Sequence, residues 1–206
     1  MKKYHIYGKS FAGSLIVEFL FEETNTNYDI TFLDQEKMKS PDFLEKNPQG
    51  KIPVLITPED NVIFESLAII THITEKNSSL IPEPNTLLRD KYWQYLSMLA
   101  AVMYPAYHRQ HHSYQYVNES GYDEIRERSR ILQSKLYDHI ENILNPYFCE
   151  SRITAVDYYF YMMSRWDLNK EKMKENRPKI SSLLEKIRKK PSVDKVLKSQ
   201  PRKKII

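Results

Sequence analysis

The sequence has a single cysteine, Cys149, among its 206 residues. One thiol cannot form an intramolecular disulfide or a cysteine-rich zinc site, and it is typical of a reducing compartment. Long apolar runs are also missing. Tyr, Gly, Lys and Glu interrupt the N-terminal segment, and no run approaches the roughly 20 residues of a membrane span. These absences predict a cytoplasmic protein with no signal peptide and no membrane partner.

A large excess of one charge is missing as well. Lysine and arginine total 31 and aspartate and glutamate 27, which leaves a formal net charge of +4. That charge is too small and too dispersed to indicate a nucleic acid partner. The 41% hydrophobic and 12% aromatic content exclude a disordered chain. We therefore expect a globular protein of one large or two small domains, which needs no disulfide or metal to bury a core.

Short strand-like and helix-like segments alternate over the first part of the chain. Tyr28, Ile30 and Phe32 alternate with Asp29 and Thr31, a pattern typical of a strand. The same reasoning predicts strands at 3–7, 28–33, 54–57 and 62–64, and helices at 12–23 and from 65 onward. A βαβ unit followed by a hairpin and a helix is the outline of a thioredoxin-like α/β domain.

A proline-rich connector without periodicity, residues 79–86, separates this part from a region of predicted helices. Those helices cover 87–114, with a bend at Pro105, and 122–144, 155–166, 180–189 and 193–199. Residues 155–166 are apolar nearly all round, which indicates a helix in a domain core. We expect a thioredoxin-like domain at 1–78, a linker at 79–86 and an all-α helical C-terminal domain at 87–206.

The most informative segment is 47–55, in which Pro53 begins a strand. A proline there belongs at a sheet edge or at a first position. A cis Ile52–Pro53 bond would turn the main-chain N–H and C=O of Ile52 outward, ready to pair with an extended peptide. Further along, Ser66 is expected to cap a helix whose free N–H groups attract a carboxylate, and Glu65 beside it supplies an anion for an ammonium group. The pair suits both plain helix capping and an amino-acid head group.

The order of these segments resembles the cytosolic glutathione transferases, and most of all their bacterial beta-like members. Asn47-Pro48-Gln49-Gly50-Lys51-Ile52-Pro53-Val54-Leu55 is followed by Glu65-Ser66, as in the glutathione-binding half of that family. Residues 151–158 resemble the family's capping signature, in which Thr154 and Asp157 form a variant capping box at the start of a buried helix. Residues 177–193 resemble its C-terminal pattern.

The resemblance implies a ligand and a set of contacts. Glutathione would be the co-substrate, without a metal, and the protein would form a homodimer. Ile52 would hydrogen-bond the cysteinyl backbone of glutathione beside Pro53, Glu65 and Ser66 would hold the γ-glutamyl head, and Lys51 would pair with the glycyl carboxylate.

A thiol of pKa about 8.5 is only about 3% ionised at pH 7, so such an enzyme must favour the thiolate. Two hydroxyls compete for that role. Tyr7 ends the first strand and is the better acid, whereas Ser10 lies nearer the first helix and matches the position of the beta-class cysteine. Ser10 is preferred and Tyr7 is the alternative. Because position 10 is serine rather than cysteine, thiol–disulfide exchange is disfavoured.

In this family the electrophile pocket lies between the domains, against the first long helix of the second domain. That helix carries Tyr104, Tyr107, His108 and His111, which would suit flat apolar substrates and tolerate anionic ones. His108 and His112 have a metal-binding spacing, but no acidic or cysteine partner is near, so no metal is expected. The expected function is detoxification by a glutathione transferase. A non-catalytic binding or regulatory dimer and a glutathione-dependent isomerase or dehalogenase stay open.

Overall fold

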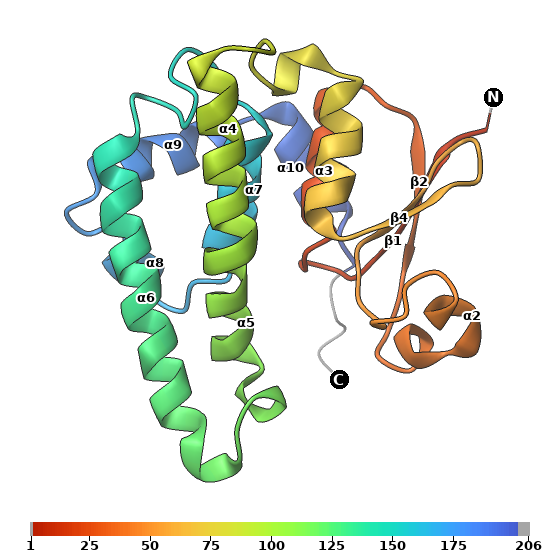
Figure 1. Cartoon of the computed structure of the whole chain (residues 1–206), viewed down its shortest axis with the longest axis horizontal. Helices are drawn as coiled ribbons and strands as arrows, with labels where there is room; N and C mark the ends of the chain where they lie inside the picture. Colours follow the sequence, from red (N-terminus) through yellow and green to blue (C-terminus); the bar gives the residue numbers. More distant parts are fainter. Residues whose placement is uncertain (1, 202–206) are drawn as a thin grey trace. The chain divides into compact units, whose positions relative to one another are not determined.

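The computed structural model describes residues 2–201, which form two compact units (Figure 1). One unit takes the chain up to Leu80 and resumes at Arg188, and the other spans Ile81–Ile187. The first contains the strands and the second is helical, so the predicted α/β region followed by a helical region is confirmed. The chain leaves the first unit and returns to it at its end.

A mixed four-stranded sheet with the order β2-β1-β3-β4 forms the centre of the first unit. Its strands are β1 (Tyr4–Gly8), β2 (Tyr28–Phe32), β3 (Val54–Ile56) and β4 (Val62–Phe64). β1 runs parallel to β2 and antiparallel to β3, and β3 pairs antiparallel with β4. The predicted βαβ unit and hairpin are therefore confirmed.

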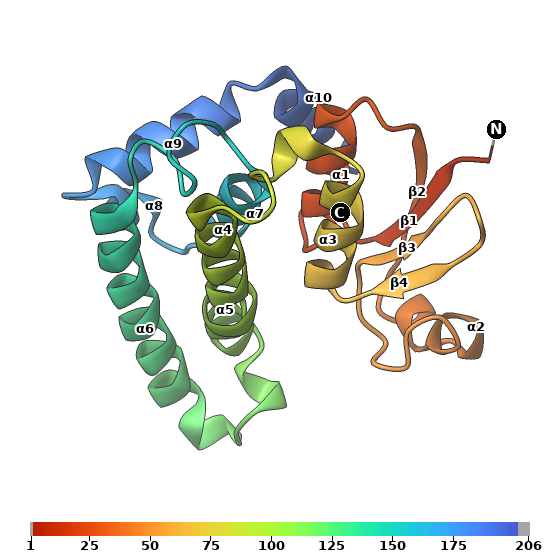
Figure 2. The ribbon, with the colours of Figure 1, turned by 45° about the horizontal axis from the view of Figure 1, so that its top comes forward.

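Helices cover both faces of this sheet (Figure 2). They are α1 (Leu15–Glu23), α2 (Pro41–Leu44) and α3 (Ser66–Glu75). Side chains alternate between the two faces of a strand. Tyr7 and its partner Val54 pack with Phe43 of α2, so the fully buried Ile6 and Leu55 point to the opposite face, where α1 and α3 pack together.

Helix α2 and the short 3-10 helix η1 (Lys37–Lys39) before it are not among the predicted elements. A Ser-Pro pair marks the start of α2. The Ser40 hydroxyl accepts from the Phe43 N–H at 3.4 Å, and Pro41 occupies the first helical turn, where its missing N–H costs nothing. This signal was present in the sequence, but four residues are too few for an apolar period.

The last helix, α10 (Pro191–Ser199), packs against α1 of the first unit (Figure 2). From its place in the sequence, this helix is predicted to belong to the helical region instead. Val193 and Val196 are buried, and Lys195 pairs with Glu22 of α1 at 2.7 Å. Because apolar contacts and charge pairs form here with a helix far away in sequence, no local pattern could have placed α10.

The second unit is built from helices. They are α4 (Leu87–Met98), α5 (Tyr104–His111), α6 (Tyr122–Ile143), α7 (Ala155–Ser164), α8 (Lys170–Lys174) and most of α9 (Pro178–Arg188). Two 3-10 turns of this unit lie at Ser113–Gln115 and Glu119–Gly121, and another, Ser78–Leu80, ends the first stretch of the first unit. α5 packs along α6. Among residues 2–201, no helix combines the length and apolar character needed to cross a membrane.

A π-helical turn, η3 (Leu99–Met103), joins α4 to α5 where a single bent helix is predicted. Pro105 lies at the start of α5. It has no N–H to donate, and its ring clashes with the carbonyl four residues earlier in an α-helix. The wider π turn relieves that clash, so the helix continues with a local change of winding.

Helix α7 is buried along its whole length, as predicted. Its capping box is confirmed: the Asp157 carboxylate accepts from the Thr154 N–H at 2.7 Å and from the Thr154 hydroxyl at 2.9 Å. The other carboxylate oxygen accepts from the Phe148 N–H at 3.1 Å. Burial raises the pKa of Asp157 to about 6, against the lowering effect of these hydrogen bonds.

Candidate functional site

The loop before β3 is held by its own side chains. The Asn47 amide donates to the Lys51 carbonyl at 2.8 Å, and its oxygen accepts from the Gln49 N–H at 3.1 Å. Gly50 has a φ of 61° and lies so close to the Met38 carbonyl that a Cβ would approach it to 3.0 Å. The loop then ends at Ile52–Pro53, a cis peptide bond. Asn47 and Gly50 therefore determine the path of the chain past Lys51 and Ile52.

Glu65 lies where β4 passes into α3, with its side chain exposed. Its φ of 69° is in the left-handed region, which costs a residue other than glycine of order 1–3 kcal/mol and is concentrated at functional sites. Gln49 donates from its amide to Glu65 Oε1 at 2.9 Å. This bond joins the loop at 47–53 to the start of α3, and Gln49 is a residue that sequence reasoning did not assign to the site.

Ser66 is the first residue of α3, and Glu65 occupies the N-cap position. The predicted capping role of Ser66 is therefore wrong, because Ser66 lies inside the helix, one residue after the N-cap position. Ser66 still belongs to the first turn of α3, where main-chain N–H groups have no acceptor within the helix itself. The start of α3 thus offers main-chain donors next to an acidic side chain.

Ser10 lies in the turn between β1 and α1. Its hydroxyl donates to the Pro201 carbonyl at 2.7 Å. The next N–H, that of Phe11, donates to Gln200 Oε1 at 3.1 Å, and Phe11 has a φ of 54°. The helix itself begins only at Leu15, with Ser14 at its N-cap. Ser10 is therefore separated from the helix start and is held by the C-terminal segment.

Ser14 is fully buried and closes this turn. Its hydroxyl donates to the Lys9 carbonyl at 3.1 Å and accepts from the Lys9 N–H at 3.2 Å. A Cβ at Gly8 would come within 2.6 Å of the Ser14 oxygen, so glycine is needed at that position. Ser14 has a structural role in the turn that carries Ser10.

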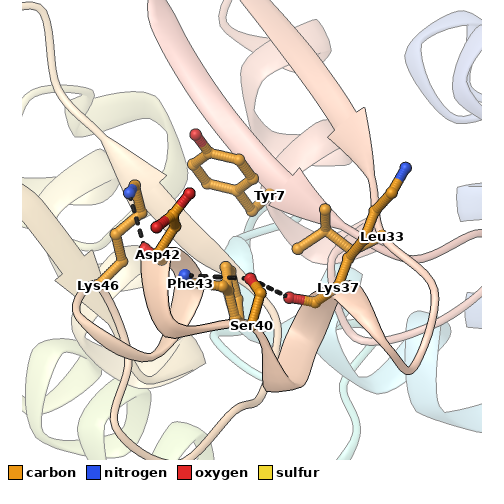
Figure 3. A pocket seen from close by; sticks show the side chains of 7 residues that line it. All are labelled: Tyr7, Leu33, Lys37, Ser40, Asp42, Phe43 and Lys46. Carbon is orange, nitrogen blue, oxygen red and sulfur yellow. Dashed lines mark hydrogen bonds between the residues drawn. The ribbon is translucent and has the colours of Figure 1, made fainter.

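Tyr7 faces α2 and lines a cavity of about 170 Å³ (Figure 3). Its ring meets those of His5 and Phe43 edge to face, with centroids 4.8 and 5.8 Å away. The other lining residues are Leu33, Lys37, Ser40, Asp42, Phe43 and Lys46. The two candidate hydroxyls thus have different surroundings: Ser10 contacts the C-terminal segment, and Tyr7 opens to an apolar cavity with basic and acidic groups at its rim.

Most predicted pocket residues of the second unit contact other residues of that unit. Tyr104 stacks on Tyr159 with centroids 6.4 Å apart. His108 Nδ1 lies 2.7 Å from the Tyr116 hydroxyl, and His111 Nε2 donates to the Trp166 carbonyl at 2.8 Å. These three side chains remain at least partly accessible.

Tyr107 requires a correction, because only 1% of it is exposed. Its hydroxyl contacts the Tyr137 hydroxyl and donates to Asp167, which also accepts from Tyr137 at 2.9 Å. Burial raises the pKa of both tyrosines well above its usual value. Tyr107 belongs to the core of the helical unit, and we leave it out of the proposed pocket.

Neither a metal centre nor a reactive thiol emerges from the described residues. His108 and His112 lie with ring centroids 4.6 Å apart, but residues 2–201 contain no cluster of three or more potential metal-ligating side chains. Cys149 is 1% exposed, and burial raises its thiol pKa to about 11. The thiol therefore stays protonated near neutral pH, which suits a packing residue rather than a nucleophile.

The chain was compared with known families and structures. The family models "Glutathione S-transferase, N-terminal domain" and "Glutathione S-transferase, C-terminal domain" match residues 1–75 and 98–200. The uncharacterized GST-like protein YncG of Escherichia coli K12 is 23% identical over 198 residues, covering 94% of this chain and 96% of that protein.

Two solved structures show the same fold. A glutathione transferase homologue from Sulfitobacter with bound glutathione has a TM-score of 0.85 at 19% identity, over 95% of this chain and 97% of that one. The bacterial beta class glutathione S-transferase of Sphingomonas chungbukensis has a TM-score of 0.81 at 22% identity, over 94% and 97%.

Proposed function

The chain belongs to the glutathione S-transferase family, and on that premise we propose that it binds glutathione and stabilises its thiolate for attack on a small electrophile. The observation that carries this proposal is the hydrogen bond between Gln49 and Glu65. It holds a carboxylate at the start of α3 beside the loop that presents the main chain of Ile52. An acid, the N–H groups of a helix start and a main-chain peptide unit that can pair are what a γ-glutamyl peptide needs.

Each part of glutathione has a proposed partner. Glu65 binds the ammonium of the γ-glutamyl head, and the Ser66 N–H with the start of α3 binds its carboxylate. The main chain of Ile52, next to Pro53, pairs with the cysteinyl backbone. Lys51 is exposed at the end of the Asn47 loop and pairs with the glycyl carboxylate. Gln49 orients Glu65.

The thiolate needs a hydrogen-bond donor. A bond from a hydroxyl to a charged group is worth about 1.5–3 kcal/mol, and each pKa unit corresponds to about 1.4 kcal/mol. One hydroxyl would therefore lower the thiol pKa by roughly one to two units. We assign this role to Ser10, with Tyr7 as the alternative.

The electrophile is proposed to be small and apolar or aromatic. Tyr104, His108 and His111 offer aromatic and polar side chains for it, and no metal is invoked. The sulfur–carbon bond forms as the thiolate attacks, and an electron pair leaves with the displaced group or, in an addition, moves onto the electrophile, which then takes up a proton from solvent. We further propose a cytoplasmic homodimer that acts in detoxification, as the family resemblance implies.

Calorimetric titration with glutathione tests the head-group assignment. Glu65→Ala removes the proposed anionic partner of the ammonium, and we expect affinity to fall about 10-fold or more, since a charge-assisted bond of about 1.5–3 kcal/mol is lost. Glu45→Ala, an exposed carboxylate at the end of α2, is the matched control and should bind like the unaltered chain. Equal affinity of Glu65→Ala and the control would refute the head-group assignment.

One observation favours a second candidate, a non-catalytic glutathione-binding dimer. The Ser10 hydroxyl is engaged with the Pro201 carbonyl, so its proton is already donated. A chain that binds glutathione with an unshifted thiol pKa and does not turn over an aryl halide would be such a binding protein. An ultraviolet scan of thiolate absorbance across pH separates the two candidates.

A further inference from the structure

The C-terminal segment Gln200–Pro201 contacts the turn that carries Ser10, although the two lie 191 residues apart in sequence. Gln200 is 3% exposed. Its side-chain oxygen accepts from the Phe11 N–H at 3.1 Å, and its nitrogen donates to Glu18 Oε2 at 2.8 Å. One amide therefore ties the turn before α1 to a buried carboxyl within α1.

This amide determines where the next carbonyl lies. Pro201 follows Gln200 directly, and its carbonyl accepts the Ser10 hydroxyl at 2.7 Å. Proline has a fixed φ, which limits the directions that the carbonyl can take once Gln200 is anchored. The Gln200 side chain therefore binds Phe11, and the Pro201 carbonyl binds the neighbouring Ser10.

Further contacts between residues 190–195 and α1 help to hold this C-terminal segment in place. Lys190 and Ser192 bind Glu23, and Lys195 binds Glu22. Together with the buried Val193 and Val196, these contacts hold α10 along α1. The segment that reaches Ser10 is therefore the end of a docked helix. Its position is set by the first unit itself.

A serine hydroxyl has one proton to donate. In this arrangement that proton goes to the Pro201 carbonyl, and the remaining lone pairs of the oxygen can only accept. A thiolate can only accept a hydrogen bond, so Ser10 cannot donate to it without breaking its bond to the Pro201 carbonyl. The Ser10–Pro201 bond and a Ser10–sulfur bond exclude each other.

We propose that Gln200 is a positioning residue that holds the Pro201 carbonyl against Ser10, so that the C-terminal segment competes with the glutathione sulfur for the Ser10 proton. This inference rests on the proposed role of Ser10 in glutathione binding. When glutathione ionises in the site, its thiol proton passes to solvent, the Ser10–Pro201 bond breaks and the Ser10–sulfur bond forms. No oxidant or further reactant takes part.

The test measures the thiol pKa of bound glutathione from thiolate absorbance across pH, at saturating glutathione established by calorimetry. Gln200→Ala frees the Pro201 carbonyl, and Gln200→Asn, whose shorter side chain cannot reach both partners, is the second variant. Release of one neutral hydrogen bond should raise the thiolate-to-thiol ratio about 2- to 10-fold. Lys198→Ala removes an exposed ion pair within α10, to Asp194, which contacts neither α1 nor Ser10, and it should leave the ratio unchanged.

Two further measurements make the result specific. Hydrogen exchange should show faster exchange of the Phe11 amide in Gln200→Ala, since its acceptor is gone, without change in the core strands. In a Ser10→Ala background, Gln200→Ala should have no effect on the thiolate ratio, because the effect passes through the Ser10 hydroxyl.

The outcomes distinguish this inference from the proposed function. If the unaltered chain does not bind glutathione, both are overturned. If it binds, and both Gln200 variants leave the thiolate ratio unchanged or lower it, the inference alone is overturned. The same holds if the rise persists without the Ser10 hydroxyl.

Discussion

At the scale of single residues, the two hydroxyls near the end of β1 should behave differently. Ser10 donates to the Pro201 carbonyl, which we propose that glutathione displaces, whereas Tyr7 lines the cavity next to α2. We expect Ser10→Ala to lower kcat/KM with an aryl halide about 10-fold or more, the value of a bond to a charged sulfur. Tyr7→Phe should change it less than about 3-fold. Equal and small losses in both variants would contradict a single activating hydroxyl.

The residues of the site divide into those that a sequence pattern could identify and those that it could not. Ile52, Pro53 and Glu65 lie in a segment order that is informative in itself, and the Gln49–Glu65 bond, which the sequence does not predict, joins their two segments. The sequence does not indicate the hydrogen-bond partners at Ser10, because Pro201 binds Ser10, and Gln200 binds the neighbouring Phe11, from the far end of the chain. Chemistry-bearing residue types can be identified locally, but their hydrogen-bond partners cannot.

At the scale of elements, the elements with a clear period were predicted and the others were missed. β2 and α6 have regular apolar spacing over their length, and α7 is apolar nearly all round. α2 is too short for a period, and the π turn η3 arises from a steric conflict at Pro105 rather than from hydrophobicity. The family resemblance places Tyr107 in the pocket by its position on the first long helix, and its spacing there does not reveal that its side chain packs on α6.

The contact of α10 with α1 encloses Glu18, which is 1% exposed. Burial raises its pKa to about 8, the bond from Gln200 opposes that rise and the charge of Glu22 adds to it. The folded chain therefore holds a proton that the unfolded chain releases near pH 4.5. The stability that the protonated Glu18 contributes is fully present below pH 4.5 and falls as the pH rises toward 8, by up to about 3 kcal/mol at pH 7.

Urea denaturation at several pH values between 4.5 and 8 measures this loss. Glu18→Gln keeps the shape of the side chain and cannot ionise, so its stability should vary much less with pH and exceed that of the unaltered chain at pH 8. Asp157, with a pKa of about 6, contributes a loss of the same sign at lower pH in both proteins. The difference between the two proteins isolates Glu18, and parallel pH profiles would refute the assignment.

At the scale of the whole molecule, segments that are far apart in sequence form one compact unit. The first unit is completed only when the chain returns from the second unit at Arg188. α10 buries Val193 and Val196 against it and supplies Lys190, Lys195 and Gln200 to the acidic face of α1. The sheet and α1 are thus stabilised by residues more than a hundred positions away, which family models that match the two regions separately do not express.

A chain that ends at Ile187 should test this dependence. It keeps the whole second unit but loses α10, and two buried valines alone are worth about 3–6 kcal/mol, a large share of the 5–15 kcal/mol of a typical domain. Three carboxylates of α1, Glu18, Glu22 and Glu23, also lose their contacts with the C-terminal segment. Hydrogen exchange should therefore become fast in β1 and α1 while α6 and α7 stay protected. A chain that ends at Pro201 keeps all of these contacts and is the control. Equal protection of α1 in both shortened chains would mean that the first unit is stable without its C-terminal helix, and that α10 merely rests on a surface that is already complete.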